Sequence, residues 1–129
     1  MTTGGPDRAA GYTPQPDGGQ SPLDELLDAL GHSTRRRVLS HLRGHGVATL
    51  DELAAEIAAW EMGAPPDEVP AARRERAAST LAHTHLPKLA RSGCIEYDAR
   101  SQTARYDDPS ALVDLLVLLL AKFDDEPGT

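Results

Sequence analysis

Large apolar residues recur three and four positions apart along the chain, and this spacing predicts a series of amphipathic helices. The predicted helices cover residues 22–30, 33–43, 50–60 and 71–92. The first begins with Ser21 as N-cap and Pro22 at the first helical position. Gly31 is expected to end the first helix and Gly44 the second, and a capping box at 49–52 opens the third. The pattern therefore predicts a helical domain.

The fourth and longest helix has two chemically different sides when its residues are placed at 100° steps. One side is apolar apart from a histidine: Ala78, Leu81, Ala82, His85 and Leu89. The other side carries Arg73, Arg76, Thr80 and His83. An apolar back with an outward row of cations and hydroxyls is what a DNA recognition helix needs. Pro87 should bend the last turn and re-phase Leu86 toward the core.

Period-two alternation replaces the helical spacing after Gly93. Residues 94–98 and 103–106 alternate as two strands around a turn at 99–102, which predicts a hairpin. Val47 is a candidate for a further short strand. Arg100 and Arg105 would place positive charge on this hairpin, the candidate wing.

A last helix is predicted over residues 108–124, opened by Asp108 and Pro109 and apolar nearly all round. Interrupted by Asp114, its apolar run falls short of the roughly 20 residues that cross a bilayer. A buried core helix and a dimer seam both remain open. One arrangement packs Leu112, Leu116, Leu119 and Phe123 on the first helix, while Val113, Leu115, Leu118 and Lys122 meet a second copy.

We expect a symmetric homodimer through this helix, since a two-fold partner would place two recognition helices one DNA turn apart. The residues predicted to form the dimer interface are Val113, Leu115, Leu116, Leu119, Leu120 and Phe123.

The predicted fold class is mainly α with a small β-hairpin: a winged helix-turn-helix followed by a C-terminal apolar helix. Residues 1–20, rich in Gly and Pro, are predicted to be a disordered arm. The winged-helix domain is placed at 21–107, the dimerisation or core helix at 108–124 and a tail at 125–129.

Charge is unevenly distributed along the chain. The net charge of −7 argues against nucleic acid at first sight, because phosphate is bound by Lys and Arg. The basic residues nevertheless gather, in Arg35-Arg36-Arg37 and in Arg73-Arg74-Arg76. The triplet lies in the first turn of a helix, where cations are unfavourable unless an anion or an acidic neighbour pairs with them. It therefore indicates either a phosphate contact or a solvated face paired with Asp24 or Asp28.

The sequence offers no chemistry of catalysis or metal binding. It contains no nucleophile, paired-carboxylate or phosphate-loop signature, so we expect no enzyme and no cofactor. His83 and His85 point about 200° apart on a helix, and with Cys94 they do not complete a zinc site. His85 is expected to be a core histidine with one hydrogen bond. The single cysteine and the absence of a leader indicate a cytoplasmic protein.

The chain resembles a haloarchaeal family of winged-helix domains of unknown function, described as transcriptional regulators related in fold to ArsR-like proteins. The segments that carry the resemblance are Leu30-Gly31, Arg35-Arg36-Arg37-Val38-Leu39, Leu50-Asp51-Glu52-Leu53-Ala54, Ala59-Trp60-Glu61, His83-Thr84-His85-Leu86-Pro87-Lys88-Leu89 and Ile95-Glu96-Tyr97-Asp98. The resemblance implies DNA contact by Arg76, Thr80, His83 and Thr84 and dimerisation through terminal helices. The paired cysteines of metal-sensing relatives are absent from the third helix.

These inferences lead to one functional hypothesis and one alternative. The hypothesis is a dimeric regulator that binds double-stranded DNA. Its predicted DNA contacts are Arg35, Arg36, Arg37, Arg73, Arg76, Thr80, His83, Thr84, Lys88, Arg100 and Arg105. The alternative is a winged-helix module that binds another protein and not DNA, which the acidic net charge favours.

Overall fold

The computed structural model describes residues 21–107 and 111–125 as a mainly helical domain with a small antiparallel sheet. In chain order the elements are α1 (Pro22–Leu30), α2 (Ser33–His45), β1 (Val47–Thr49), α3 (Leu50–Met62), a 3₁₀ turn (Pro66–Glu68), α4 (Ala71–Thr80), a π-helical turn (Leu81–His85), α5 (Leu86–Arg91), β2 (Ile95–Asp98), β3 (Thr103–Tyr106) and α6 (Ala111–Asp125). The predicted N-terminal arm, Asp108, Pro109 and residues 126–129 of the predicted tail lie outside the described residues.

Helix ends follow the predicted capping chemistry with one exception. The Ser21 and Thr49 side chains each accept from the backbone N–H three residues on, and Asp24 and Glu52 complete the two capping boxes. The expectation that Gly44 ends α2 was wrong. The helix continues to His45 and stops at Gly46, whose φ of 85° suits a residue without a Cβ.

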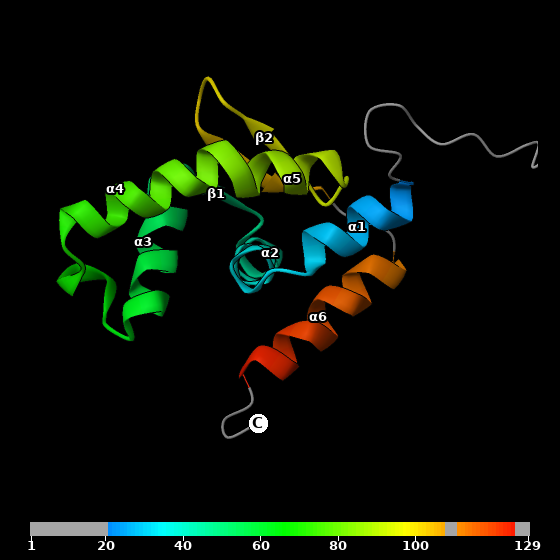
Figure 1. The fold of residues 1–129 in the computed structure, drawn as a ribbon, viewed down its shortest axis with the longest axis horizontal. Helices are drawn as coiled ribbons and strands as arrows, with labels where there is room; N and C mark the ends of the chain where they lie inside the picture. The colour runs from blue at the N-terminus through cyan, green and yellow to red at the C-terminus, as the bar shows by residue number, and fades with distance from the viewer. Residues whose placement is uncertain (1–20, 108–110, 126–129) are drawn as a thin grey trace, which may run out of the picture.

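The helices surround a core of aliphatic side chains. Val38, Leu39 and Leu42 of α2 are fully buried, as the spacing predicts. They meet Leu53 and Ile57 of α3 and the inner sides of the long helix and the sheet, all within one cluster. Figure 1 shows α2 near the centre of the domain, with α3 toward one end and α1 and α6 toward the other.

The sheet has one strand more than the predicted hairpin. β1 pairs antiparallel with β3, which also pairs with β2, so the strand order is β1-β3-β2. Ala48 and Ala104, directly opposite each other, are both buried. This pairing ties the hairpin to the start of α3 and fixes how it projects from the domain.

The long helix runs through α4, the π turn and α5 without a break. Pro87 has no N–H to donate to the carbonyl of His83, and a regular turn would bring its ring against that carbonyl. The wider π turn just before it relieves this conflict, and the backbone N–H of Leu86 bonds to Leu81 five residues back. The extra residue rotates Leu86 inward, where it is fully buried, as predicted.

α6 packs mainly on α2, whereas one predicted arrangement placed it on α1. Val117 is buried against the core, while Leu112, Leu119 and Phe123 are exposed, so the predicted packing of these three on the first helix was wrong. Two carboxylates set the rotation of the helix. Asp114 accepts from Arg43 at 2.8 and 3.0 Å, and Asp124 accepts from Arg36 at 2.8 and 3.1 Å.

Candidate nucleic-acid interface

The long helix has an exposed polar side that borders its contact with α3. Its inner side, with Ala77 and Leu81, is buried, and the pairing of α3 with α4 is the most extensive between helices of the domain. The exposed polar residues of α4 and the π turn are Arg73, Arg74, Glu75, Arg76, Ser79, Thr80, His83 and Thr84. The predicted row of α4 is therefore exposed as the 100° spacing required.

Arg73 and Arg76 are the unpaired cations of this row. Neither forms an ion pair or a side-chain hydrogen bond with any residue in 21–107 or 111–125. Arg74 differs, since its guanidinium donates to the carbonyl oxygen of Val69 at 3.1 Å. Of this arginine cluster, two side chains remain able to contact an external anion.

The neutral groups of the row are already oriented. His83 Nδ1 lies 2.8 Å from the carbonyl oxygen of Ser79, which only accepts, so Nδ1 carries the proton and Nε2 is an acceptor. The Thr80 hydroxyl donates to the carbonyl of Arg76 at 3.1 Å. Ser79 was missed at the sequence level. Its position three residues after Arg76 and four before His83 is the signal that could have found it.

The hairpin carries two further exposed arginines of the candidate interface. In Figure 1 it rises beyond α5 on the side away from α3. Arg100 lies exposed in its turn, where its backbone N–H donates to Asp98 at 2.9 Å. Arg105 is exposed and lies opposite Glu96 in the strand register, without a described ion pair.

The arginine triplet of α2 contradicts the prediction for its first member. Arg35 is only 6% exposed, and its guanidinium donates to the carbonyl oxygens of Ala29 at 2.9 Å and Asp28 at 2.7 Å. These carbonyls lie in the last turn of α1, and that of Asp28 also accepts from the backbone N–H of Gly31 at 3.2 Å. The negative end of the α1 dipole, and not a phosphate, therefore stabilises the charge of Arg35.

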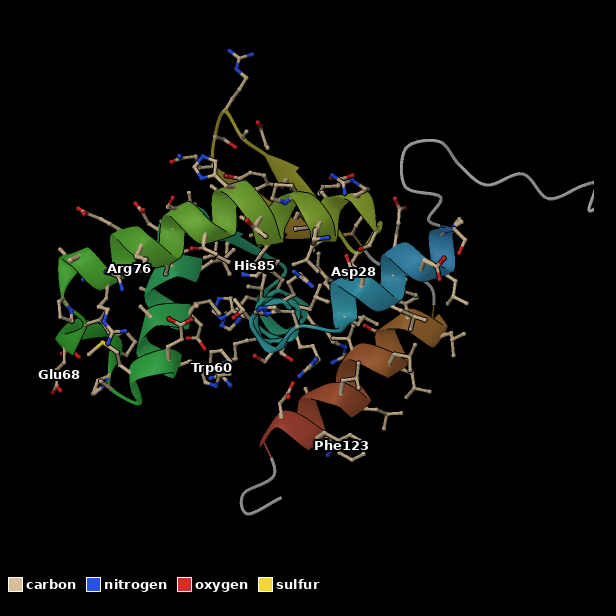
Figure 2. The ribbon with its side chains drawn as sticks, viewed as in Figure 1. Asp28, Trp60, Glu68, Arg76, His85 and Phe123 are labelled. Atoms are coloured by element: carbon tan, nitrogen blue, oxygen red, sulfur yellow. The ribbon has the colours of Figure 1, made fainter. Side chains whose placement is uncertain are left out.

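The other predicted contacts outside α4 and the hairpin also have internal partners. Arg36 bonds to Asp124, which raises the pKa of its guanidinium, and also donates to the carbonyl oxygen of Leu30. Arg37 bonds to Glu56 at 3.2 Å and lies 5.6 Å from the centre of the Trp60 ring. Figure 2 places Trp60 on the side of the domain away from the hairpin.

Lys88 pairs with Asp28 of α1 at 2.6 Å, and this contact lowers the pKa of the carboxyl. The two groups join α5 to α1, which Figure 2 shows close to each other. The predicted pairing of the triplet with Asp28 is thus present only as a longer 4.0 Å approach from Arg35.

Buried polar groups beneath the long helix form a small network. His85 is 5% exposed, and Arg35 Nη1 donates to its Nδ1 at 3.3 Å, the single hydrogen bond expected of it. Burial, with the charges of His32 and Arg35, lowers the pKa of His85 to about 4. The imidazole is therefore neutral at physiological pH.

The predicted dimer residues fall into two groups. Leu115, Leu119 and Phe123 are exposed at 49%, 47% and 72%. Val113, Leu116 and Leu120 are half-buried against the core. The exposed stripe of α6 also includes Leu112, and α1 exposes Leu23 and Leu27.

Within the described ranges, no group of three His, Cys, Asp or Glu side chains is placed to hold a metal ion. No helix there combines the length and the apolar character that crossing a bilayer requires.

The chain thus presents a small helical domain with a three-stranded sheet and an outward basic helix. A family model for a domain of unknown function, DUF7344, matches residues 27–105, and the chain belongs to this family. The match runs from α1 into β3 and excludes α6. Searches of curated proteins and of solved structures gave no match.

Proposed function

We propose that this chain is a winged-helix transcriptional regulator that binds double-stranded DNA with α4 and the β2–β3 hairpin. The order α2, β1, α3, long helix, β2, β3 is that of a winged helix-turn-helix, with the long helix in the position of the recognition helix. As part of this proposal, the chain is related to haloarchaeal, ArsR-like regulators and acts in the cytoplasm.

One observation carries the proposal: the long helix and the hairpin hold exposed arginines without described ion pairs. Arg73, Arg76, Arg100 and Arg105 lie on the long helix and the hairpin without described ion pairs. The arginines of α2 and Lys88 of α5 are instead paired inside the domain. Guanidinium groups spaced along a helix and a wing would neutralise phosphates on either side of a groove.

Base reading would fall to the short groups between these cations. Ser79 and the Nε2 of His83 lie on the outward row, and Nε2 could accept from an exocyclic amino group in the major groove. Since the net charge is −7, the DNA contact must be confined to this face of the domain. DNA binding is therefore expected to depend on the salt concentration.

We further propose that the regulator acts as a homodimer through the exposed stripe of α6. Leu112, Leu115, Leu119 and Phe123 follow one another at helical spacing, and an exposed apolar surface of this kind is typical of an interface. The same stripe supports the second candidate, a module that docks another protein and does not bind DNA.

The two candidates separate in a binding experiment on fluorescent genomic fragments, including the upstream region of the gene itself. The double variant Arg73→Ala/Arg76→Ala should lose at least about tenfold in affinity by anisotropy. Arg91→Ala removes an exposed charge at the far end of α5, beside Asp28, and is the matched control. No binding by the wild type would favour the protein-docking module, and equal losses in control and double variant would contradict the assignment of Arg73 and Arg76 to the DNA contact.

A further inference from the structure

A small cavity lies between α2, α3 and the long helix, beside the proposed DNA face. Its volume is about 110 Å³. Ligand pockets for drug-sized molecules are several times larger, so this cavity suits a molecule of fewer than about ten heavy atoms. Its floor is buried and formed by Thr34, Ile57, Leu81 and His85 together with Ala77.

Two polar side chains in the floor lack a full set of partners. Thr34 is 8% exposed, and its hydroxyl bonds to no residue in the described parts of the chain. In His85, Arg35 occupies Nδ1 as a donor, so the proton is on Nε2, which has no described acceptor. Buried polar groups are nearly always hydrogen-bonded. Two such groups lining one cavity indicate a place for a ligand oxygen.

The mouth of the cavity is mainly cationic. Arg73 and Arg76 lie there without ion pairs, and the buried guanidinium of Arg35 lies behind His85. Glu61 is the acidic residue among those that line the cavity. Two guanidinium groups suit a carboxylate, while Glu61 disfavours a dianion.

We propose that this cavity binds a small monocarboxylate with an oxygen on the carbon next to the carboxylate, that is, a 2-hydroxy or 2-oxo acid. The carboxylate contacts Arg73 and Arg76, and the neighbouring oxygen accepts from Thr34 and His85. A short apolar tail packs on Ile57 and Leu81. An ammonium group in the place of that oxygen cannot accept from His85, so the matching amino acid binds more weakly.

This ligand would also regulate DNA binding, a consequence that rests on the proposed function. Arg73 and Arg76 serve both sites, so a bound carboxylate withdraws them from phosphates. Ligand binding itself does not depend on DNA.

Titration of the full chain with sodium lactate, pyruvate, propanoate and alanine, followed by two-dimensional NMR, tests the site. Lactate or pyruvate should saturate shifts at the cavity residues in the millimolar range, about 1 mM. Propanoate, which lacks the oxygen, and alanine should each bind at least about fivefold more weakly, because the floor groups stay unpaired.

Thr34→Val removes one floor donor without touching the exposed face of α4. It should lower lactate affinity toward that of propanoate, since only His85 still donates to the ligand oxygen, and leave propanoate binding and thermal stability unchanged. Arg73→Ala/Arg76→Ala should abolish binding of both acids. Absence of saturation by lactate and pyruvate, or propanoate or alanine binding as tightly as these, overturns the site.

Competition between lactate and DNA is measured in a separate experiment. Lactate should weaken DNA binding of the wild type more than propanoate does at equal ionic strength, and this difference should be smaller in Thr34→Val. If DNA does not bind at all, the NMR result still decides the ligand site. If DNA binds and lactate binds without competing, the regulatory consequence is wrong.

Discussion

Arg35 is the residue whose role differs most from what its sequence context indicates. Its guanidinium caps the carboxyl end of α1 and fixes the neutral form of His85. Since a helix terminus leaves its last carbonyls unpaired, a buried arginine beside it satisfies several of them at once. Arg35 therefore holds α1, α2 and the long helix together from inside.

Arg35→Ala should lower the free energy of unfolding by about 2 to 5 kcal/mol, because buried carbonyls lose their donors. Arg35→Lys should recover less than half of this loss, since one ammonium does not span the same acceptors. Urea denaturation measures both, with Arg91→Ala expected within about 0.5 kcal/mol of wild type. A loss below about 1 kcal/mol in Arg35→Ala contradicts the assigned role.

His85 makes stability depend on pH. Its pKa is about 4 in the folded chain against an ordinary value of 6.5. Between these values the unfolded chain binds a proton that the folded chain does not, so stability is present above pH 6.5 and is lost as pH falls toward 4. The slope approaches about 1.4 kcal/mol per pH unit.

His85→Asn keeps an acceptor for Arg35 but does not titrate, so its stability should vary less over this window. Urea melts at several pH values measure the difference, and the lowered pKa of His41 contributes equally to both proteins. The lowered pKa values of Asp28 and Asp114 act below their ordinary 3.8, outside the window. Parallel profiles for the two proteins would show that His85 is not the titrating group.

At the scale of elements, hydrophobic spacing predicts the helices well because each buries one side against a common core. Capping chemistry places the starts of α1 and α3, where Ser21 and Thr49 act locally. The end of α2 was misplaced by two residues, because Gly44 and Gly46 offer the same local signal and only the chain direction into β1 chooses between them.

The candidate site was predictable only in part. The row on α4 follows from the 100° spacing alone. The partners of the arginine triplet could not be predicted in this way. Asp124 and the end of α1 reach the triplet through packing that the local sequence does not encode. The rotation of α6 about its axis could not be predicted for a similar reason. A helix that is apolar all round has no preferred face, so its ion pairs to α2 decide which side is buried.

The attachment of α6 depends on Asp114, which accepts from Arg43 and, at 2.7 Å, from the Tyr106 hydroxyl, whose pKa is raised by burial and this bond. Asp114→Asn should speed amide hydrogen exchange in α6 by roughly tenfold, as charged hydrogen bonds are lost. Exchange in α3 should not change. Equal protection of α6 in both proteins would mean that apolar contacts alone hold the helix.

At the scale of the whole molecule, the domain has two unlike surfaces. One is the basic face of the long helix and hairpin, and the other is the apolar stripe of α6 at the opposite end from α3 (Figure 1). A dimer through the stripe would leave both basic faces exposed.

Sedimentation analysis should find the wild type as a dimer and Leu115→Glu/Leu119→Glu as a monomer, because two buried charges would face each other across the interface. Val47→Glu, at an exposed apolar position of β1, is the matched control and should remain dimeric. A monomeric wild type, or a double variant that still dimerises, contradicts the proposed interface.

The central claim is that the arginines of α4 contact phosphate and those of α2 do not. The most direct test is the salt dependence of DNA affinity for Arg76→Ala and Arg37→Ala, since each lost phosphate contact reduces the slope of log K against log salt concentration by about 1. We predict this reduction for Arg76→Ala and an unchanged slope for Arg37→Ala. The Arg37 side chain bonds to Glu56 and lies beside Trp60, which Figure 2 places on the side away from the hairpin. The opposite result, with the slope lowered by Arg37→Ala and not by Arg76→Ala, would contradict the account.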